Sequence, residues 1–315
     1  MNRNFAFIGA VALCMGATVS HGATPNAELP AAIYADPPVD PAHPASGQGI
    51  QFESHGSLIN AQLYQSAGEG VHPTVVLLHG LPGNEQNLDL AQTMRRAGWT
   101  VISFHYRGSW GSGGTFSLNN GIDDTKALLA LLSRPASASS WGVDASRIVL
   151  VGHSYGGYVA ARVAADAPAL AGVALIAPWD ISVDQRAWAT LTPARRQSVG
   201  LAGFNDVDGR LKGATARSLI DEVMRDGAQF DLTKLAPRLA GRPLLIVTAI
   251  HDDDDDKALG LLSSLDRDHA EHLTTEVMDT DHGFNDHRIA LQIAVLRWLA
   301  SLKGAPVLAK ERTSP

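Results

Sequence analysis

Residues 147–165 read RIVLVGHSYGGYVAARVAA, and they hold the most informative local pattern of the chain. A continuously apolar run ends at Val151, a turn of the form G-x-S-x-G follows, and an alanine-rich helical pattern begins at once. In this context a serine sits on a strained turn with its hydroxyl raised above the sheet, and the glycines remove side chains that would collide with the backbone. The helix then points its N-terminal amides at the serine, which favours developing negative charge. The pattern predicts that Ser154 is a nucleophile.

The chain on either side alternates apolar runs with helical patterns. Runs that are apolar along their whole length predict buried strands, and their alternation with helices predicts an α/β fold with a mostly parallel central sheet flanked by helices. The expected strands are Ile50–Glu53, Leu58–Gln65, Thr74–Leu78, Thr100–Phe104, Ile148–Val151, Val173–Ile176, Leu244–Val247 and Thr274–Met278. The expected helices include Gln86–Ala97, Ile122–Ser133, Tyr155–Ala165 and Asp286–Leu302.

Residues 179–240 interrupt this alternation. They show helical patterning without a clear strand, and they are longer than a connection between two sheet strands needs to be. An insertion of this length predicts a helical cap over an active site. The alternative is a pair of ordinary covering helices with long loops.

From about Gly49 to Leu302 the chain resembles an α/β-hydrolase, on the G-H-S-Y-G turn and on the segment VVLLHGLPGNEQN at 75–87. In that family a His-Gly-x-Pro loop supplies one amide of the oxyanion hole. The resemblance implies that the N–H groups of Leu81 and Tyr155 bind the oxyanion and that His79 shapes the loop. Each such amide typically contributes roughly 3 kcal/mol to transition-state stabilisation.

The segment FHYRGSWGSGGTFS at 104–117 is similar to the Tyr-Arg-Gly-Ser loops of prolyl-oligopeptidase-like and dienelactone-hydrolase-like members of the family. The large peptidases of that branch carry a propeller before the catalytic domain. Only the 25 residues 24–48 stand between the apolar N-terminal segment and the hydrolase-like region, so a propeller is not expected. This weakens the expectation of a peptidase.

A serine hydroxyl becomes a useful nucleophile only when a base takes its proton and an acid orients that base. The resemblance implies the chain order serine, acid, histidine. The late histidine is therefore expected in EVMDTDHGFNDHRIALQ at 276–292. His282 follows the last expected strand and precedes the last helix, which is where α/β-hydrolases carry the base. His287 is the alternative, about one helical turn further on, where it is expected to lie at the helix start.

Five consecutive aspartates, Asp252–Asp256, follow the strand expected after Pro243. The family places the acid about nine residues after this proline, and that count leads to Asp252. A glycine often stands three residues before the acid, but Ala249 occupies that position here. Asp253 is therefore kept as the second candidate.

The remaining aspartates of this run need another explanation. An uncompensated buried carboxylate costs several kcal/mol, so we expect them to face solvent, some of them capping a helix near Lys257. A calcium site is the alternative, because carboxylates suit calcium. Consecutive residues point in different directions, however, and His269 and His272 lack the spacing of a zinc helix. The sequence predicts no metal site and no cofactor.

Residues 1–23 contain Arg3, an apolar stretch and small residues up to Ala23, which is the pattern of a secretory signal peptide. The apolar stretch is short for a transmembrane span, so we expect Sec export to the periplasm or the medium, without a membrane anchor. The single cysteine, Cys14, lies in this segment. We expect a proline-rich lead-in over 24–48, the hydrolase domain over 49–303, and a C-terminal tail over 304–315.

The net charge of −7, without a basic cluster, gives no electrostatic case for binding nucleic acid. The sequence predicts a secreted serine hydrolase that cleaves a small carboxylic ester through an acyl-enzyme. An aminopeptidase or dipeptidyl-peptidase acting on short peptides is the alternative. It would need an acidic anchor among Asp180, Asp184, Asp221 and Glu222. A non-catalytic binding protein of the same fold is the third reading, although such relatives usually lose a triad member. The oligomeric state stays open.

Overall fold

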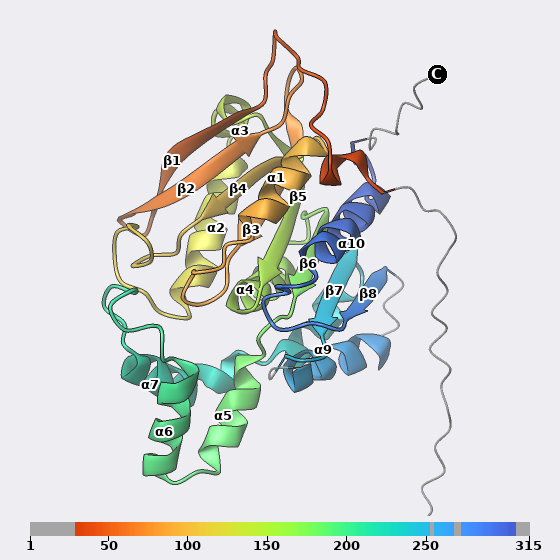
Figure 1. Ribbon diagram of the computed structural model, residues 1–315. Coiled ribbons are helices and arrows are strands. Elements are labelled where there is room, and N and C mark those ends of the chain that lie inside the picture. Colours follow the sequence, from red (N-terminus) through yellow and green to blue (C-terminus); the bar gives the residue numbers. More distant parts are fainter. Residues whose placement is uncertain (1–28, 253–254, 268–271, 307–315) are drawn as a thin grey trace, which may run out of the picture.

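The structure is a computed structural model that describes residues 29–252, 255–267 and 272–306 (Figure 1). Within these residues its centre is an eight-stranded sheet of order β1-β2-β4-β3-β5-β6-β7-β8. The β1–β2 and β2–β4 pairs are antiparallel and all the other pairs are parallel. The strands are β1 (Ser46–Ser54), β2 (Ser57–Gln65), β3 (His72–Leu78), β4 (Thr100–Phe104), β5 (Val143–His153), β6 (Gly172–Ile176), β7 (Leu244–Ala249) and β8 (Leu273–Met278).

Helices cover the sheet on both faces, because alternate residues of the central strands point into two separate cores. Val149 and Val151 of β5 pack in the core beneath α1 (Leu88–Arg96) and α10 (Arg288–Ser301). Ile148 and Leu150 pack in the opposite core, with α2 (Asn120–Leu132), α4 (Tyr155–Asp166) and α9 (Asp255–Arg267). The fully apolar strands are thus explained by burial on both sides.

The predicted fold class is confirmed. β4 has the expected bounds, and the other expected strands are present and longer than their apolar runs. The prediction missed α3 (Pro135–Ser140), which is too short to show a helical period. It also missed the 3₁₀ turn at Ala31–Ile33 in the lead-in, whose Ala32 is buried against α1 and α10.

Between β6 and β7 the chain forms α5 (Ile181–Ala189), α6 (Pro193–Gly203) and α7 (Ala216–Asp226), which we call the helical layer. 3₁₀ turns (Gly227–Gln229 and Leu232–Leu235) and α8 (Ala236–Leu239) lead back to the sheet. Figure 1 shows α5, α6 and α7 together outside the sheet, below the strand ends. Because β5 and β6 are parallel, the helical layer lies at the same sheet edge as the turn that follows β5.

The helical layer is tied to the β4–α2 loop, residues 105–119. The buried carboxylate of Glu222 on α7 accepts hydrogen bonds from the N–H groups of Leu118 (3.1 Å) and Asn119 (3.3 Å). Burial raises the pKa of Glu222 despite these bonds. Ser109 and Leu211 form an isolated antiparallel bridge between the same loop and the segment before α7. The loop therefore fixes the position of the layer.

A buried ion pair anchors the β4–α2 loop. The Arg107 backbone N–H donates to Asp124 Oδ2 (2.8 Å) and its Nε donates to Oδ1 (2.5 Å). Ser54 Oγ donates to the same carboxylate at 2.6 Å. The side chains of Arg107 and Asp124 are 11% and 0% exposed. Burial raises the pKa of Asp124 in spite of its donors. The pair therefore adds little net stability, although each partner needs the other.

We expect Asp124→Asn to lower the free energy of unfolding by about 3 kcal/mol, because the buried Arg107 guanidinium loses its buried counter-charge and keeps only the partly exposed Asp123. Urea unfolding of both proteins measures the difference. Asp123→Asn is the matched control, since Asp123 also faces Arg107 (3.5 Å) but is 46% exposed. Its loss should cost less than about 1 kcal/mol. Equal losses in the two variants would contradict the role given to the buried pair.

Two histidines are buried where strands end. His79 directly follows β3, and His153 is the last residue of β5. Burial lowers the pKa of His79 to about 4 and that of His153 to about 3, from an ordinary value of 6.5. Below pH 6.5 the unfolded chain therefore binds protons that the folded chain does not. The stability linked to these groups is complete above about pH 6.5 and is lost as the pH falls toward the folded pKa values.

We expect the free energy of unfolding to depend less steeply on pH between 6.5 and 4 in His79→Asn than in the wild-type protein. The asparagine amide can replace the bond from His79 Nδ1 to the Gly80 carbonyl (2.7 Å), but it does not titrate. Denaturant unfolding at intervals between pH 6.5 and 4 measures the pH dependence of the free energy of unfolding in each protein. The carboxyl groups contribute equally to both proteins, so the difference between the two slopes reports on His79. An unchanged slope would mean that the fold accepts a proton on His79 without cost.

Candidate active site

Ser154 stands between β5 and α4 in a backbone conformation that few residues adopt. Its φ is 56° and its ψ is −121°, and a strained conformation of this kind costs of order 1–3 kcal/mol. Hydrogen bonds hold the turn: Ser154 N–H donates to the Ile176 carbonyl (2.9 Å), and Tyr158 N–H donates to the Ser154 carbonyl (3.1 Å). The serine side chain lines a cavity at the edge of the sheet.

The two glycines of this turn are required by close approach of the backbone. A Cβ on Gly152 would lie 2.1 Å from the Gly156 carbonyl oxygen, and a Cβ on Gly156 would lie 2.2 Å from the Leu78 carbonyl oxygen. A side chain at either position would push α4 away from the strands. Packing therefore explains the G-x-S-x-G spacing.

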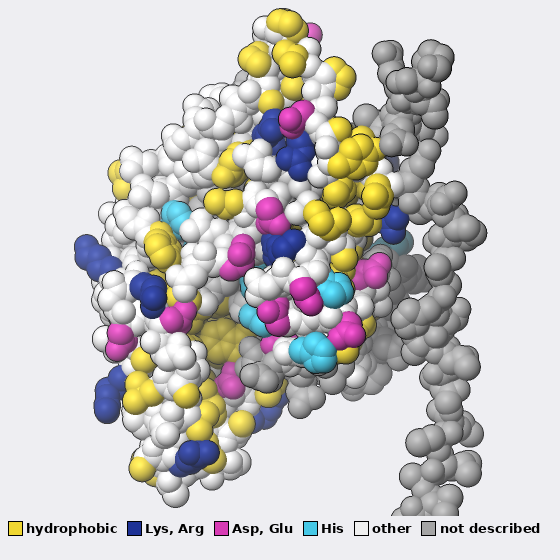
Figure 2. All heavy atoms as spheres, viewed as in Figure 1, with side chains coloured by type: hydrophobic (Ala, Val, Ile, Leu, Met, Phe, Trp, Pro, Cys, Tyr) yellow, Lys and Arg dark blue, Asp and Glu magenta, His cyan; other side chains and the backbone are white. Residues whose placement is uncertain are grey.

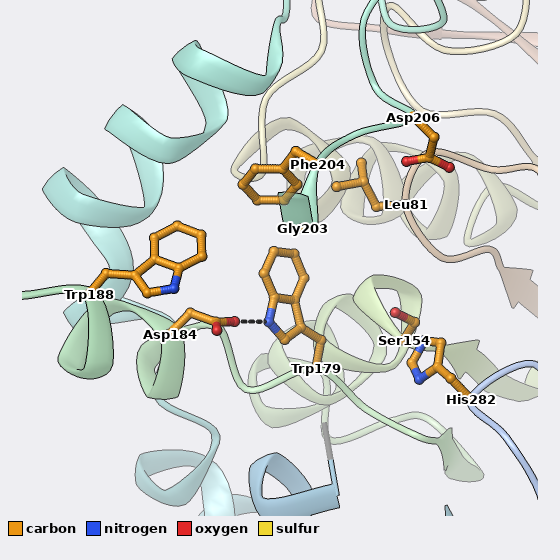
Figure 3. Close-up of a pocket in the computed structure, with 9 residues that line it drawn as sticks. All are labelled: Leu81, Ser154, Trp179, Asp184, Trp188, Gly203, Phe204, Asp206 and His282. Carbon is orange, nitrogen blue, oxygen red and sulfur yellow. Dashed lines mark hydrogen bonds between the residues drawn. The ribbon is translucent and has the colours of Figure 1, made fainter. Parts of the chain in front are cut away.

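Asp252 and His282 form a pair beside Ser154. His282 Nδ1 lies 2.7 Å from Asp252 Oδ2, and the two side chains are 36% and 6% exposed, respectively. A carboxylate only accepts, so Nδ1 carries the proton and Nε2 is the nitrogen that can take one. Figure 3 shows Ser154 and His282 side by side on one wall of the cavity.

The pairing of β7 with β8 explains why the first aspartate of the run reaches the histidine. The alignment continues past the strand ends, where His251 N–H donates to the Thr280 carbonyl (3.1 Å). This leaves Asp252 opposite His282. Asp253, the second candidate, lies outside the described residues. α9 begins at Asp255, slightly before the expected start near Lys257.

His153, the second residue of the motif, contacts the histidine in a way that the sequence analysis missed. Its Nε2 lies 2.8 Å from the backbone carbonyl oxygen of His282, and the two ring centroids are 4.8 Å apart. A carbonyl only accepts, so Nε2 carries the proton, and the low pKa keeps His153 neutral. The sequence offered one sign of this contact, because His153 directly precedes Ser154 and its side chain is buried where β5 ends. His153 holds the backbone of His282 without adding charge.

The amides expected to bind an oxyanion lie next to Ser154. Tyr155 is the first residue of α4, and Leu81 lines the same cavity as the serine. Gly80 brings the two segments together, because a Cβ on Gly80 would lie 3.1 Å from Ser154 Cβ. Neither the Leu81 nor the Tyr155 N–H donates to an acceptor among the described residues. Both amides can therefore receive a carbonyl oxygen that gains negative charge.

The β4–α2 loop holds the segment that carries Leu81. Tyr106 Oη donates to the His79 carbonyl at 3.0 Å. Trp110 Nε1 donates to the Pro82 carbonyl at 2.7 Å. The His79 ring is buried behind this segment and does not line the cavity, so its contacts are those of a residue that shapes the loop.

A cavity of about 280 Å³ opens beside Ser154, where the helical layer meets the body. Figure 2 shows a hollow with hydrophobic side chains at this junction. The volume is close to the lower limit for small-molecule sites. The residues that line it are Leu81, Ser154, Trp179, Asp184, Trp188, Gly203, Phe204, Asp206 and His282 (Figure 3).

The structure separates the acidic residues that could anchor a charged substrate. Asp180 is buried as the N-cap of α5, Glu222 ties α7 to the β4–α2 loop, and Asp221 is exposed on α7. Asp184 lines the cavity. Asp206 lines it too, although the sequence analysis did not single it out. It comes from the segment between α6 and α7, and nothing in its local sequence marks it.

The other candidate residues lie away from this arrangement. His287 is the N-cap residue of α10, and its Nδ1 lies 3.0 Å from Asp286. His269 lies outside the described residues. Among the side chains that the structure describes, no group of three or more His, Cys, Asp or Glu could hold a metal ion. No helix in the described ranges has the length and apolar character needed to cross a bilayer.

Comparisons with known proteins extend these observations. The structure resembles that of a 2,6-dihydroxy-pseudo-oxynicotine hydrolase, with a TM-score of 0.61 and 21% identity over 85% of this chain and 72% of that one. It also resembles an esterase of Pyrococcus furiosus (0.59 and 17%, over 86% and 98%) and an acylaminoacyl peptidase of Pyrococcus horikoshii (0.60 and 16%, over 86% and 43%). At such identities the likeness concerns the fold alone.

Comparison with curated proteins gives no significant match. Residues 75–291 match the family model described as the alpha/beta hydrolase family, and this range holds most of β3 and all of β4 to β8, together with Ser154, Asp252 and His282. The match confirms the resemblance seen in the sequence. It covers more than half of the chain, and the protein therefore belongs to the alpha/beta hydrolase family.

Proposed function

We propose that the protein is a serine hydrolase that cleaves a carboxylic ester through an acyl-enzyme. Ser154 is the nucleophile, His282 the base and Asp252 the acid that orients it. The observation that carries this proposal is the hydrogen-bonded His282–Asp252 pair beside a serine held on a strained turn. A histidine oriented by a buried carboxylate activates a neighbouring hydroxyl.

In the first half of the reaction, Ser154 Oγ attacks the ester carbonyl carbon while its proton moves to His282 Nε2. The carbonyl oxygen becomes an oxyanion, which the N–H groups of Leu81 and Tyr155 stabilise. Asp252 stabilises the imidazolium. The bond from carbon to the alcohol oxygen then breaks, and His282 gives the proton to that oxygen. The alcohol leaves and the acyl group stays on Ser154.

In the second half, a water molecule attacks the acyl carbon while His282 takes one of its protons. The bond to Ser154 Oγ then breaks, and His282 returns the proton to this oxygen. The carboxylic acid is released and the serine is regenerated. Neither half calls for a cofactor.

A peptidase is the second candidate, because Asp184 places a carboxylate in the cavity that a substrate's N-terminal ammonium could pair with. The size of the cavity argues for the ester. About 280 Å³ suits a small molecule better than an extended peptide.

We expect Ser154→Ala to lose ester turnover by a factor on the order of 10⁴–10⁶, because the acyl-enzyme cannot form. Initial rates on p-nitrophenyl acetate and on alanine p-nitroanilide measure ester and amide cleavage. A fluorophosphonate probe should label the wild-type protein and spare the variant.

The p-nitrophenyl ester and the p-nitroanilide distinguish an esterase from a peptidase. Ester turnover that depends on Ser154, without anilide cleavage, supports the esterase. Anilide cleavage at a comparable or higher rate would favour the peptidase. Turnover that persists in Ser154→Ala would overturn the proposed mechanism for both.

We expect His153→Ala to lower kcat roughly tenfold to hundredfold, because His282 loses the donor that holds its backbone. KM should change by less than about twofold, since His153 does not line the cavity. His153→Gln places an amide donor near the position of Nε2 and should recover most of the loss. Steady-state kinetics measures both parameters. A wild-type kcat in His153→Ala would show that this bond does not position the base.

We also propose that the protein acts in the periplasm or the medium, after export and removal of residues 1–23. The pattern of Arg3 followed by an apolar stretch supports this proposal. Cell fractionation and the mass of the isolated chain test it. A chain that keeps residues 1–23 and stays in the cytoplasm would contradict it.

A further inference from the structure

Three aromatic side chains gather in the cavity beside Ser154. The rings of Trp179 and Phe204 have centroids 6.0 Å apart and an interplanar angle of 67°. Those of Trp188 and Phe204 are 6.1 Å apart at 86°. All three residues line the cavity and come from the helical layer or the segment that leads into it. The face of an aromatic ring is electron-rich and attracts cations.

Two carboxylates line the same cavity. Figure 3 shows Asp184 on the far side of Trp179 from Ser154, and Asp206 across the cavity near Leu81. No lysine or arginine is among the described residues that line the cavity. The described lining residues therefore bring two acidic side chains into a partly enclosed space, where charges interact more strongly than in open water.

One of these carboxylates acts directly on an aromatic ring. Trp179 Nε1 donates a hydrogen bond to Asp184 Oδ2 at 2.6 Å. An indole that donates to an anion is polarised so that its ring becomes more electron-rich, which strengthens its attraction for a cation. Asp206 is held by Asn84, which lies in the segment after β3 and whose Nδ2 donates to Asp206 Oδ2 at 3.0 Å.

We propose that the substrate carries a positively charged nitrogen, an alkylammonium or quaternary ammonium group, that binds against the wall formed by Trp179, Trp188 and Phe204 while its ester carbonyl reaches Ser154. The inference rests on the proposed function and names its substrate class. A neutral aromatic ester would also pack against these rings. A neutral ester would gain nothing from the charge of Asp184 and Asp206, whereas a cation is attracted to both carboxylates.

Two pairs of thioesters that differ only in nitrogen or carbon at one position test the inference. In the first pair the difference lies on the leaving group: acetylthiocholine carries a trimethylammonium group, and S-(3,3-dimethylbutyl) thioacetate carries a neutral tert-butyl group in its place. In the second pair the difference lies on the acyl group: the S-ethyl thioester of 4-(trimethylammonio)butyrate is cationic, and that of 5,5-dimethylhexanoate is its neutral analogue. Release of thiol gives kcat/KM for all four. We expect the cationic member of at least one pair to be favoured about tenfold or more.

The variant Asp184→Asn removes the charge and keeps an oxygen to which Trp179 can donate. It should reduce the preference for the cation to about threefold or less. Asp221→Asn is the matched control. It makes the same chemical change on an exposed residue of α7 that does not line the cavity, and it should keep the preference. An equal loss of preference in both variants would overturn the inference.

The outcomes separate this inference from the proposed function. Equal kcat/KM within both pairs, all of it lost in Ser154→Ala, would overturn the cation site and leave the serine hydrolase standing. Turnover that is absent, or that survives in Ser154→Ala, would count against the proposed function instead.

Calorimetry then decides the cation site without turnover, by titrating tetramethylammonium into the Ser154→Ala protein. Binding that weakens about tenfold when Asp184→Asn is added would support the site. No binding to the Ser154→Ala protein would overturn it.

Discussion

The start of α4 approaches the ends of β3 and β5 so closely that no Cβ fits between them. This contact fixes the geometry of the whole sheet edge, because Gly156 lies against the Leu78 carbonyl and Gly152 against Gly156. The chain can pass from β5 into α4 at this distance only through a sharp turn, and Ser154 takes up the strain. The same approach brings Gly80, and with it the Leu81 amide, next to the serine. The Ser154 hydroxyl and the N–H groups of Leu81 and Tyr155 thus meet as a result of backbone packing.

The strands and the turn that carries Ser154 could be predicted from the sequence, because each shows as a pattern of neighbouring residues. Continuous apolar runs indicated the strands, and the G-x-S-x-G turn between a strand and a helix indicated Ser154. His282 came from the place between the last strand and the last helix where the family resemblance puts the base. Asp252 came from a count taken from the family, and the structure places it against His282 because the β7–β8 alignment continues past the strand ends.

Other features depend on contacts between distant segments, which no local pattern records. The bond from His153 to the His282 carbonyl joins residues far apart in sequence. Asp206 reaches the cavity only because the chain between α6 and α7 folds back beside the loop that holds Leu81, where Asn84 meets it. Short elements such as α3 give too few residues for a period to appear.

The acidic residues differ in what they do because each carboxylate has different hydrogen-bond donors around it. Asp124 and Glu222 are buried among backbone N–H groups and, for Asp124, an arginine, so their charge serves the scaffold. Asp180 uses its carboxylate to cap α5. Asp252 faces an imidazole, and Asp184 faces an indole on the cavity wall. Residues of one chemical type therefore stabilise the fold, pair with a histidine beside Ser154 or line the cavity.

The β4–α2 loop has a consequence for how such a protein can acquire new specificity. It supports the segment that carries Leu81 through Tyr106 and Trp110, and it pairs with the helical layer through Ser109. The layer that lines the cavity and the segment that carries the Leu81 amide thus share one support. The helical layer is not an exchangeable module: a layer transplanted from a relative would need its own β4–α2 loop. Evolution toward a new substrate on this scaffold must therefore change both segments together.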